Sequence, residues 1–135
     1  MQTGRIFYLL QMKIEVSNGE IIDKLTILTI KLQNIKDEEK LINIRKEYEQ
    51  LKRAAEQIGM SENDKLYMDL LSVNNKLWDI EDKIRDCERN SNFGEIFVEL
   101  ARSVYITNDE RSRIKKEINR ATGSELTEEK SYKDY

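Results

Sequence analysis

The sequence of 135 residues contains no proline, no histidine, a single cysteine and five glycines. Without histidine, the chain cannot form a Ser-His-Asp or Cys-His catalytic group or ligate zinc through an imidazole. A single cysteine excludes an internal disulfide and a CxxC metal site, and it favours a reducing compartment. The absence of proline and the few glycines leave few programmed breaks in secondary structure. Several classes of enzyme and metal site are therefore excluded before any motif is considered.

Long apolar runs are also missing from the N-terminal region. The short run from Ile6 to Leu10 is well below the about 20 apolar residues that a membrane-spanning helix needs. It also lacks the longer apolar region and the small-residue cleavage site of a secretory signal. The formal net charge of -3 argues against a general nucleic-acid binder. We therefore expect a cytoplasmic protein with no membrane partner and no nucleic-acid partner.

What the chain does contain is typical of long amphipathic helices in a single domain, with 39% hydrophobic and 36% charged residues. Ser17 and Glu20 have the spacing of a capping box. After them, Ile21, Leu25 and Leu28 recur at helical spacing, which predicts a helix over about 18–36. Similar apolar stripes predict three further helices, over about 38–58, 62–89 and 95–122, the last with a C-terminal cap at Gly123.

Short linkers predict that successive helices pack antiparallel. We expect an all-α fold, an antiparallel up-down bundle of four helices over residues 17–123. Residues 1–16 would form an N-terminal arm or a short extended segment, with Met12 as a second plausible start. Residues 124–135 are polar and are expected to form a tail that is ordered only if it docks.

The turn between the third and fourth helices is unusually apolar. These two helices are about 8 residues longer than the first two, so their hairpin should project by about 12 Å at 1.5 Å per residue. Apolar side chains at this tip need a cover in water, and we predict an interface there. A homodimer is the expected arrangement, with the N-terminal arm or another protein as alternative covers. The predicted interface residues are Phe93, Ile96, Phe97 and Leu100.

A polar stripe runs beside the apolar seam of the last two helices. If the two helices pair around the turn at 90–94, the residue numbers of facing positions sum to about 184. In this register Arg85 lies opposite Glu99, and Glu81 lies near Arg102. One interpretation is an inter-helical ion-pair ladder that fixes the register. The other is a pocket for a phosphate or carboxylate, because guanidinium groups match such anions. The candidate residues are Trp78, Glu81, Arg85, Arg102, Tyr105, Asn108, Asp109, Arg111 and Lys115.

No metal, cofactor or catalytic residue is expected from the remaining motifs. Three aspartates on the third helix share a face but alternate with basic residues, which indicates a solvated acidic face. The glycines are scattered singly, so no phosphate-binding glycine loop is present. Cys87 lies on the apolar stripe and is interpreted as a small buried hydrophobe. If the pocket were the active site of an enzyme, Glu81 or Asp109 would be the acid–base group.

Several strings resemble an uncharacterised family of small all-helical bacterial and phage proteins, a domain of unknown function. They are EVSNGEIIDKLTIL at 15–28, LWDIEDKIR at 77–85, LARSVY at 100–105, NDER at 108–111, KKEIN at 115–119 and EEKSY at 128–132. The resemblance covers about residues 12–132 and implies no established activity. Its association with the glycosyltransferases of surface-polysaccharide assembly implies either an accessory or partner-binding role or a pocket for a phosphorylated sugar.

Two functions therefore remain open from the sequence. The first is a non-enzymatic interaction or accessory module. The second is a small enzyme or binding protein for an anionic metabolite, built on the Arg/Lys cluster between the third and fourth helices. Convergent, unpaired cations in a concave site would favour the second function. Cations that are already paired with carboxylates would indicate the register-fixing ladder. An exposed apolar tip around Phe93 and Phe97, or its burial against a second copy, would favour the first function.

Overall fold

The computed structural model describes residues 12–135, which contain four α-helices and no strand. The helices are α2 (Asn18–Asn34), α3 (Glu38–Ile58), α4 (Lys65–Arg89) and α5 (Glu95–Thr122). The predicted all-α class is confirmed, and the helix bounds lie within about three residues of those expected. Residues 12–17 precede α2 without regular structure, and the rest of the predicted N-terminal arm lies outside the described residues. No helix within residues 12–135 combines the length and the apolar character needed to cross a membrane.

The helix ends follow local sequence signals. The Ser17 side chain accepts a hydrogen bond from the backbone amide of Glu20 at 3.3 Å, as the capping-box spacing predicts. Asp37 accepts hydrogen bonds from two backbone amides at the start of α3. Gly59 and Gly123 end α3 and α5 in the left-handed conformation, with φ of 84° and 68°. These signals act over a few residues, so the sequence alone reveals them.

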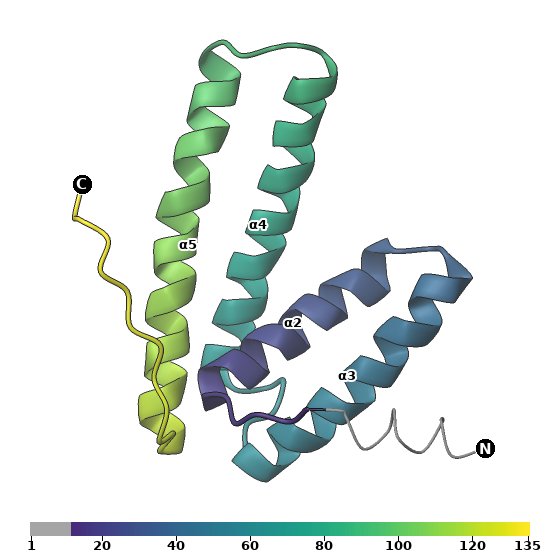
Figure 1. The fold of residues 1–135 in the computed structure, drawn as a ribbon, viewed down its shortest axis with the longest axis vertical. Coiled ribbons are helices and arrows are strands. Elements are labelled where there is room, and N and C mark those ends of the chain that lie inside the picture. The colour runs from purple at the N-terminus through teal and green to yellow at the C-terminus, as the bar shows by residue number, and fades with distance from the viewer. Residues whose placement is uncertain (1–11) are drawn as a thin grey trace.

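The four helices form two hairpins, α2–α3 and α4–α5, that are strongly inclined to each other (Figure 1). Helix α2 is central and contacts α3, α4 and α5, whereas α3 packs mainly on α2. The expected up-down bundle, with all four helices nearly parallel, is not confirmed. The physical reason lies in α2, where Ile22, Leu25, Leu28 and Ile30 are buried on several sides. A helix that is apolar on several sides can lie across a hairpin instead of beside it.

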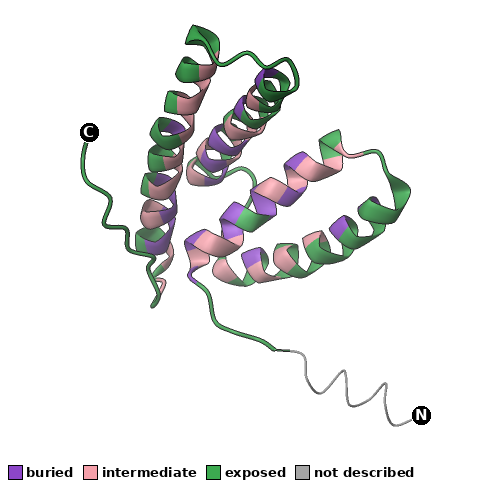
Figure 2. Cartoon of the chain, turned by 45° about the horizontal axis from the view of Figure 1, so that its top comes forward, coloured by how far each residue is buried: buried purple, intermediate pink, exposed green. Residues whose placement is uncertain are grey.

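The hydrophobic core lies where α2 crosses the base of the α4–α5 hairpin. Its main buried cluster comprises Ile22, Leu25, Ala55, Tyr67, Leu70, Val73, Ile114 and Ile118. A second cluster of Leu28, Leu41 and Ile44 joins α2 to α3. Figure 2 shows that buried residues concentrate on α2 and on the α4–α5 segments near it.

The far end of the α4–α5 hairpin extends beyond the α2–α3 hairpin (Figure 1). We call residues 77–108 the distal half of this hairpin. Among the predicted interface residues there, Phe93 and Ile96 are 55% and 61% exposed, and Phe97 and Leu100 are half-buried. The Phe93 and Phe97 rings pack edge to face with their centroids 5.5 Å apart. The distal half thus carries apolar side chains that the described chain leaves largely uncovered.

Candidate functional site

A buried polar network joins α2, α4 and α5 at the base of the α4–α5 hairpin. At its centre is Asp23, whose carboxylate is 1% exposed. Arg111 of α5 donates to both oxygens of this carboxylate, from Nε at 2.9 Å and from Nη2 at 2.5 Å. Asn74 of α4 donates to Asp23 Oδ1 at 2.9 Å and to Thr26 Oγ1 at 2.8 Å. One carboxylate therefore fixes the relative positions of three helices.

The network satisfies its own hydrogen-bonding needs. A buried carboxylate is costly unless it is paired and hydrogen-bonded, and Asp23 has both kinds of partner. The Arg111 Nη1 group donates to Asn108 Oδ1 at 3.3 Å, and the Asp23 hydrogen bonds raise the pKa of Arg111. Among the described residues, no buried side-chain nitrogen or oxygen lacks a hydrogen-bond partner. The arrangement is therefore suited to holding helices together.

A second cation, which is buried, lies one helical turn further along α5. The Lys115 ammonium is 2.8 Å from Glu20 Oε2 and 3.2 Å from Glu128 Oε2, and its side chain is 11% exposed. Burial alone would lower the pKa of Lys115, but the hydrogen bond to Glu20 and the charge of Asp23 raise it overall. In return, the Lys115 hydrogen bond lowers the pKa of Glu128. Lys115 thus links the start of α2 to the C-terminal tail.

The first turn of α2 lies directly against the last turns of α5. The Gly19 amide donates to Asn119 Oδ1 at 2.6 Å, and the Asn18 amide donates to Ser124 Oγ at 3.1 Å. A Cβ atom on Gly19 would lie 2.5 Å from the backbone oxygen of Lys115. Only glycine therefore permits this close approach. Asn119 of α5 and Ser124, just after that helix, cap free amides of α2.

The residues predicted as a site fall into two groups. Asn108, Arg111 and Lys115 lie in or beside the buried network. The others lie on the distal half or beside it: Trp78, Glu81, Arg85, Arg102, Tyr105 and Asp109. The structure therefore does not gather the four predicted cations into one cluster.

The proposed cross-hairpin ladder has a different form in the structure. Arg85 pairs with Glu81 along α4 at 3.4 Å rather than with Glu99 across the hairpin. Neither Glu99 nor Arg102 forms an ion pair within residues 12–135. The ring of Tyr105 instead packs on that of Tyr135 in the tail, with centroids 5.3 Å apart. A hydrogen bond to Asp109 raises the pKa of Tyr135.

Asp23 and Asn74 were not among the predicted site residues. A usable signal existed for Asp23, which precedes the buried Thr26 and Ile30 by three and seven residues and so shares their helix face. A charged residue on a buried face requires a partner of opposite charge. Within residues 12–135, no group of three or more acidic, cysteine or histidine side chains is placed to hold a metal ion.

The buried network also shows which side of the hairpin faces α2. Asn74 and Arg111 both bind Asp23 of α2, so their helix faces mark that side. At helical spacing, the same face continues through Trp78, Glu81 and Arg85 on α4, and through Asn108, Val104 and Phe97 on α5. Helix α2 covers this face only at the base (Figure 1). We call its continuation along the distal half the distal face.

Comparison with known proteins identifies one family. The model of a family of unknown function (DUF6165) matches residues 12–135, nearly the whole chain. No curated protein matches the chain, and no solved structure matches it.

Proposed function

The chain belongs to this family of unknown function, and we propose that it is a non-enzymatic interaction module that forms a homodimer through its distal face. The observation that carries the proposal is the continuity of this face. At the base, α2 fills the side of the α4–α5 hairpin marked by Asn74 and Arg111. Further along, the same side has no covering helix among the described residues (Figure 1). A helix from a partner would continue the packing that α2 begins.

The chemistry of the distal face supports a helical partner. Its central positions on α5, Phe97 and Val104, are apolar and half-buried, and Trp78 lies on the α4 side. Apolar positions at spacings of three, four and seven residues are those that helices present to one another. Two hairpins joined by these faces would form a four-helix arrangement in which each hairpin covers the other.

The charges of the distal face support a second copy as the partner. Glu81 and Arg85 lie on it with side chains 50% and 67% exposed, so one surface carries both signs. A two-fold symmetric interface needs such self-complementarity, because the same patch meets itself. A partner of a single charge sign would leave one of these residues facing a like charge.

The size of the distal face indicates a weak dimer. Residues 77–89 and 95–108 give two helical segments about 20 Å long, and two helices side by side are about 20 Å wide. Specific interfaces usually bury about 800 Å² of accessible surface on each partner. A face of this size is at the small end for specific interfaces, which is typical of weak and transient complexes, so we expect a dissociation constant of about 1–100 μM.

A binding role agrees with the state of the candidate cations. Arg111 and Lys115 already contact the carboxylates of Asp23, Glu20 and Glu128. Each is therefore part of an ion pair within the fold, and an anionic ligand would have to displace a carboxylate. The resemblance noted in the sequence supports an accessory role beside the glycosyltransferases of surface-polysaccharide assembly. A reducing cytoplasmic compartment is part of the proposal, because the single cysteine, Cys87, is a buried free thiol.

Sedimentation equilibrium on the full chain tests the dimer. We expect reversible self-association of the wild type and at least tenfold weaker association of Phe97→Glu, which places a charge in the centre of the distal face. The matched control is Ile106→Glu. Ile106 is 45% exposed on the same helix, but it is nine residues from Phe97 and therefore half a turn away around α5. Far-UV circular dichroism checks that both variants fold.

Two results would overturn the homodimer. One is a wild type that stays monomeric at about 500 μM, several times the weakest expected dissociation constant. That result would leave a different protein as the partner of the distal face. The other is equal weakening by Phe97→Glu and Ile106→Glu, which would mean that the association does not use the distal face.

A further inference from the structure

A cavity of about 570 Å³ lies between α5 and the C-terminal tail. The tail leaves α5 after Gly123 and runs back along that helix (Figure 1), held by ion pairs from Lys115 to Glu128 and from Lys116 to Glu129. Pockets for small molecules usually measure about 300–1,000 Å³. The cavity is separate from the distal face, so its function does not depend on the proposed dimer.

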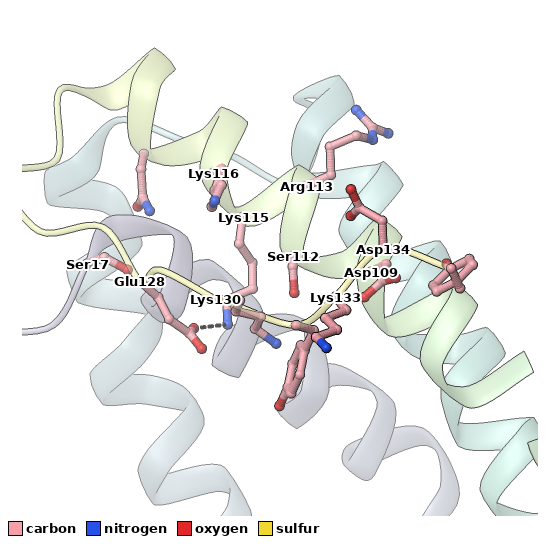
Figure 3. Close-up of a pocket in the computed structure, with 13 residues that line it drawn as sticks. Ser17, Asp109, Ser112, Arg113, Lys115, Lys116, Glu128, Lys130, Lys133 and Asp134 are labelled. Carbon is pink, nitrogen blue, oxygen red and sulfur yellow. Dashed lines mark hydrogen bonds and ion pairs between the residues drawn. The ribbon is translucent and has the colours of Figure 1, made fainter. Parts of the chain in front are cut away.

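The cavity is lined by more cationic than anionic side chains, although the whole chain is acidic. Its cations are Arg113, Lys115, Lys116, Lys130 and Lys133, and its anions are Asp109, Glu128 and Asp134. Figure 3 shows Ser112 and Lys115 projecting from α5 while Glu128, Lys130 and Lys133 come from the tail that crosses it. Arg113 points away from the tail in this view and pairs with Glu110 and Glu117 along α5. The lysines are therefore the cations available to a molecule in the cavity.

Glu128 places a carboxylate against Lys115 at the edge of the cavity. Its carboxylate lies 3.2 Å from the Lys115 ammonium, yet its side chain is 50% exposed. Lys115 retains Glu20 at 2.8 Å as a second partner, so it does not lose all charge compensation if Glu128 leaves. An exposed tail carboxylate on a buried ammonium can therefore exchange with another anion at modest cost.

We propose that this cavity binds a small molecule carrying a phosphate group, which displaces Glu128 from Lys115. Lys115 would contact the phosphate from α5, and Lys130 and Lys133 would close over it from the tail. The Ser112 hydroxyl supplies a neutral donor at the cavity wall. Lysine ammonium groups are flexible point charges that suit phosphate oxygens. The tail then acts as both a wall of the site and a tethered competitor for it.

Isothermal titration calorimetry of the full chain with pyrophosphate tests the site, at pH 7.5 and with chloride of matched ionic strength as the reference. We expect saturable binding by the wild type, in the millimolar range or tighter. Glu128→Gln should bind about fivefold tighter, because it removes the carboxylate that competes for Lys115, and a pair of unit charges about 4 Å apart in a water-like dielectric corresponds to about this factor. The double variant Lys130→Ala, Lys133→Ala should bind at least fivefold more weakly.

Glu129→Gln is the matched control for the Glu128→Gln variant. Glu129 is the adjacent tail carboxylate; it does not line the cavity, but its partner Lys116 does, so Glu129→Gln frees a cavity lysine other than Lys115. Tighter binding by Glu128→Gln than by Glu129→Gln would support a site at Lys115. Equal effects of the two variants would overturn it, as would a wild type and a Glu128→Gln variant that respond to pyrophosphate no more than to chloride.

Discussion

Breaking the Arg111–Asp23 ion pair from its two ends should have unequal effects on stability. Arg111→Met leaves the Asp23 carboxylate charged and only 1% exposed, with Asn74 and Thr26 as its neighbours in the network. Asp23→Asn instead leaves the Arg111 side chain, which is 26% exposed and can reach water. The arginine change should therefore be the more damaging of the two, although both remove the same interaction.

The expected magnitudes follow from burial. Removing one partner of a buried pair and leaving a buried charge costs about 3–5 kcal/mol, which we expect for Arg111→Met. Losing hydrogen bonds to a charged group that can rehydrate costs about 1.5–3 kcal/mol, which we expect for Asp23→Asn. At a few degrees per kcal/mol for a domain of this size, Arg111→Met should melt roughly 10–20 °C below the wild type.

The assay is urea unfolding at one fixed protein concentration, because self-association would otherwise add to the apparent stability. The double variant completes a thermodynamic cycle, and its two changes should be non-additive by about 2 kcal/mol, since each alone already breaks the pair. The reasoning would be refuted if Arg111→Met cost less than about 1 kcal/mol, or if Asp23→Asn proved the more destabilising change.

Two further predictions concern the packing of α2 and the attachment of the tail. Gly19→Ala should destabilise by about 1–3 kcal/mol in a thermal melt despite the better helix propensity of alanine, because its Cβ would lie 2.5 Å from the backbone oxygen of Lys115. Gly94→Ala, whose Cβ would meet its nearest neighbour at 3.6 Å, should show only the cost of alanine at a helix N-cap, about 1 kcal/mol or less, and an equal or larger effect than that of Gly19→Ala would contradict this packing. The lowered pKa of Glu128 means that its contribution to tail attachment is complete above its ordinary value of 4.5 and is lost as the pH falls through the lower folded value. Tail amide resonances should therefore move towards random-coil positions with a midpoint below pH 4.5 while α2 resonances persist, and a midpoint at or above pH 4.5 would argue against the Lys115 contact.

Local features of this fold were predictable from the sequence. Helix positions follow from apolar spacing, and the cap at Ser17 and the left-handed residue at Gly123 follow from residue type. The inclination of the two hairpins was not predictable in the same way. Periodicity indicates how much of α2 is buried, but it does not give the direction in which another helix crosses it.

Only the α5 residues of the buried network could be predicted from the sequence. Arg111 and Lys115 were identified because cations interrupt the apolar pattern of α5, whereas Asp23, 88 residues away from Arg111, was not. Spacing places a residue on a face but does not say which distant helix that face meets. Arg85 illustrates the same point, since it pairs with Glu81 one turn away along α4. Such i, i+4 partners are available whatever the register of the hairpin.

The capping of α2 by α5 has a consequence for synthesis of the protein. The Gly19 amide bonds to Asn119, 100 residues later in the chain. At about 5–20 residues per second, a ribosome needs roughly 5–20 s to make the intervening segment. During this time the most buried helix of the fold has α3 beside it but neither its final cap nor the α5 surface that it packs against. Nascent α2 therefore remains open to chaperones and to misassociation until translation has delivered the end of α5.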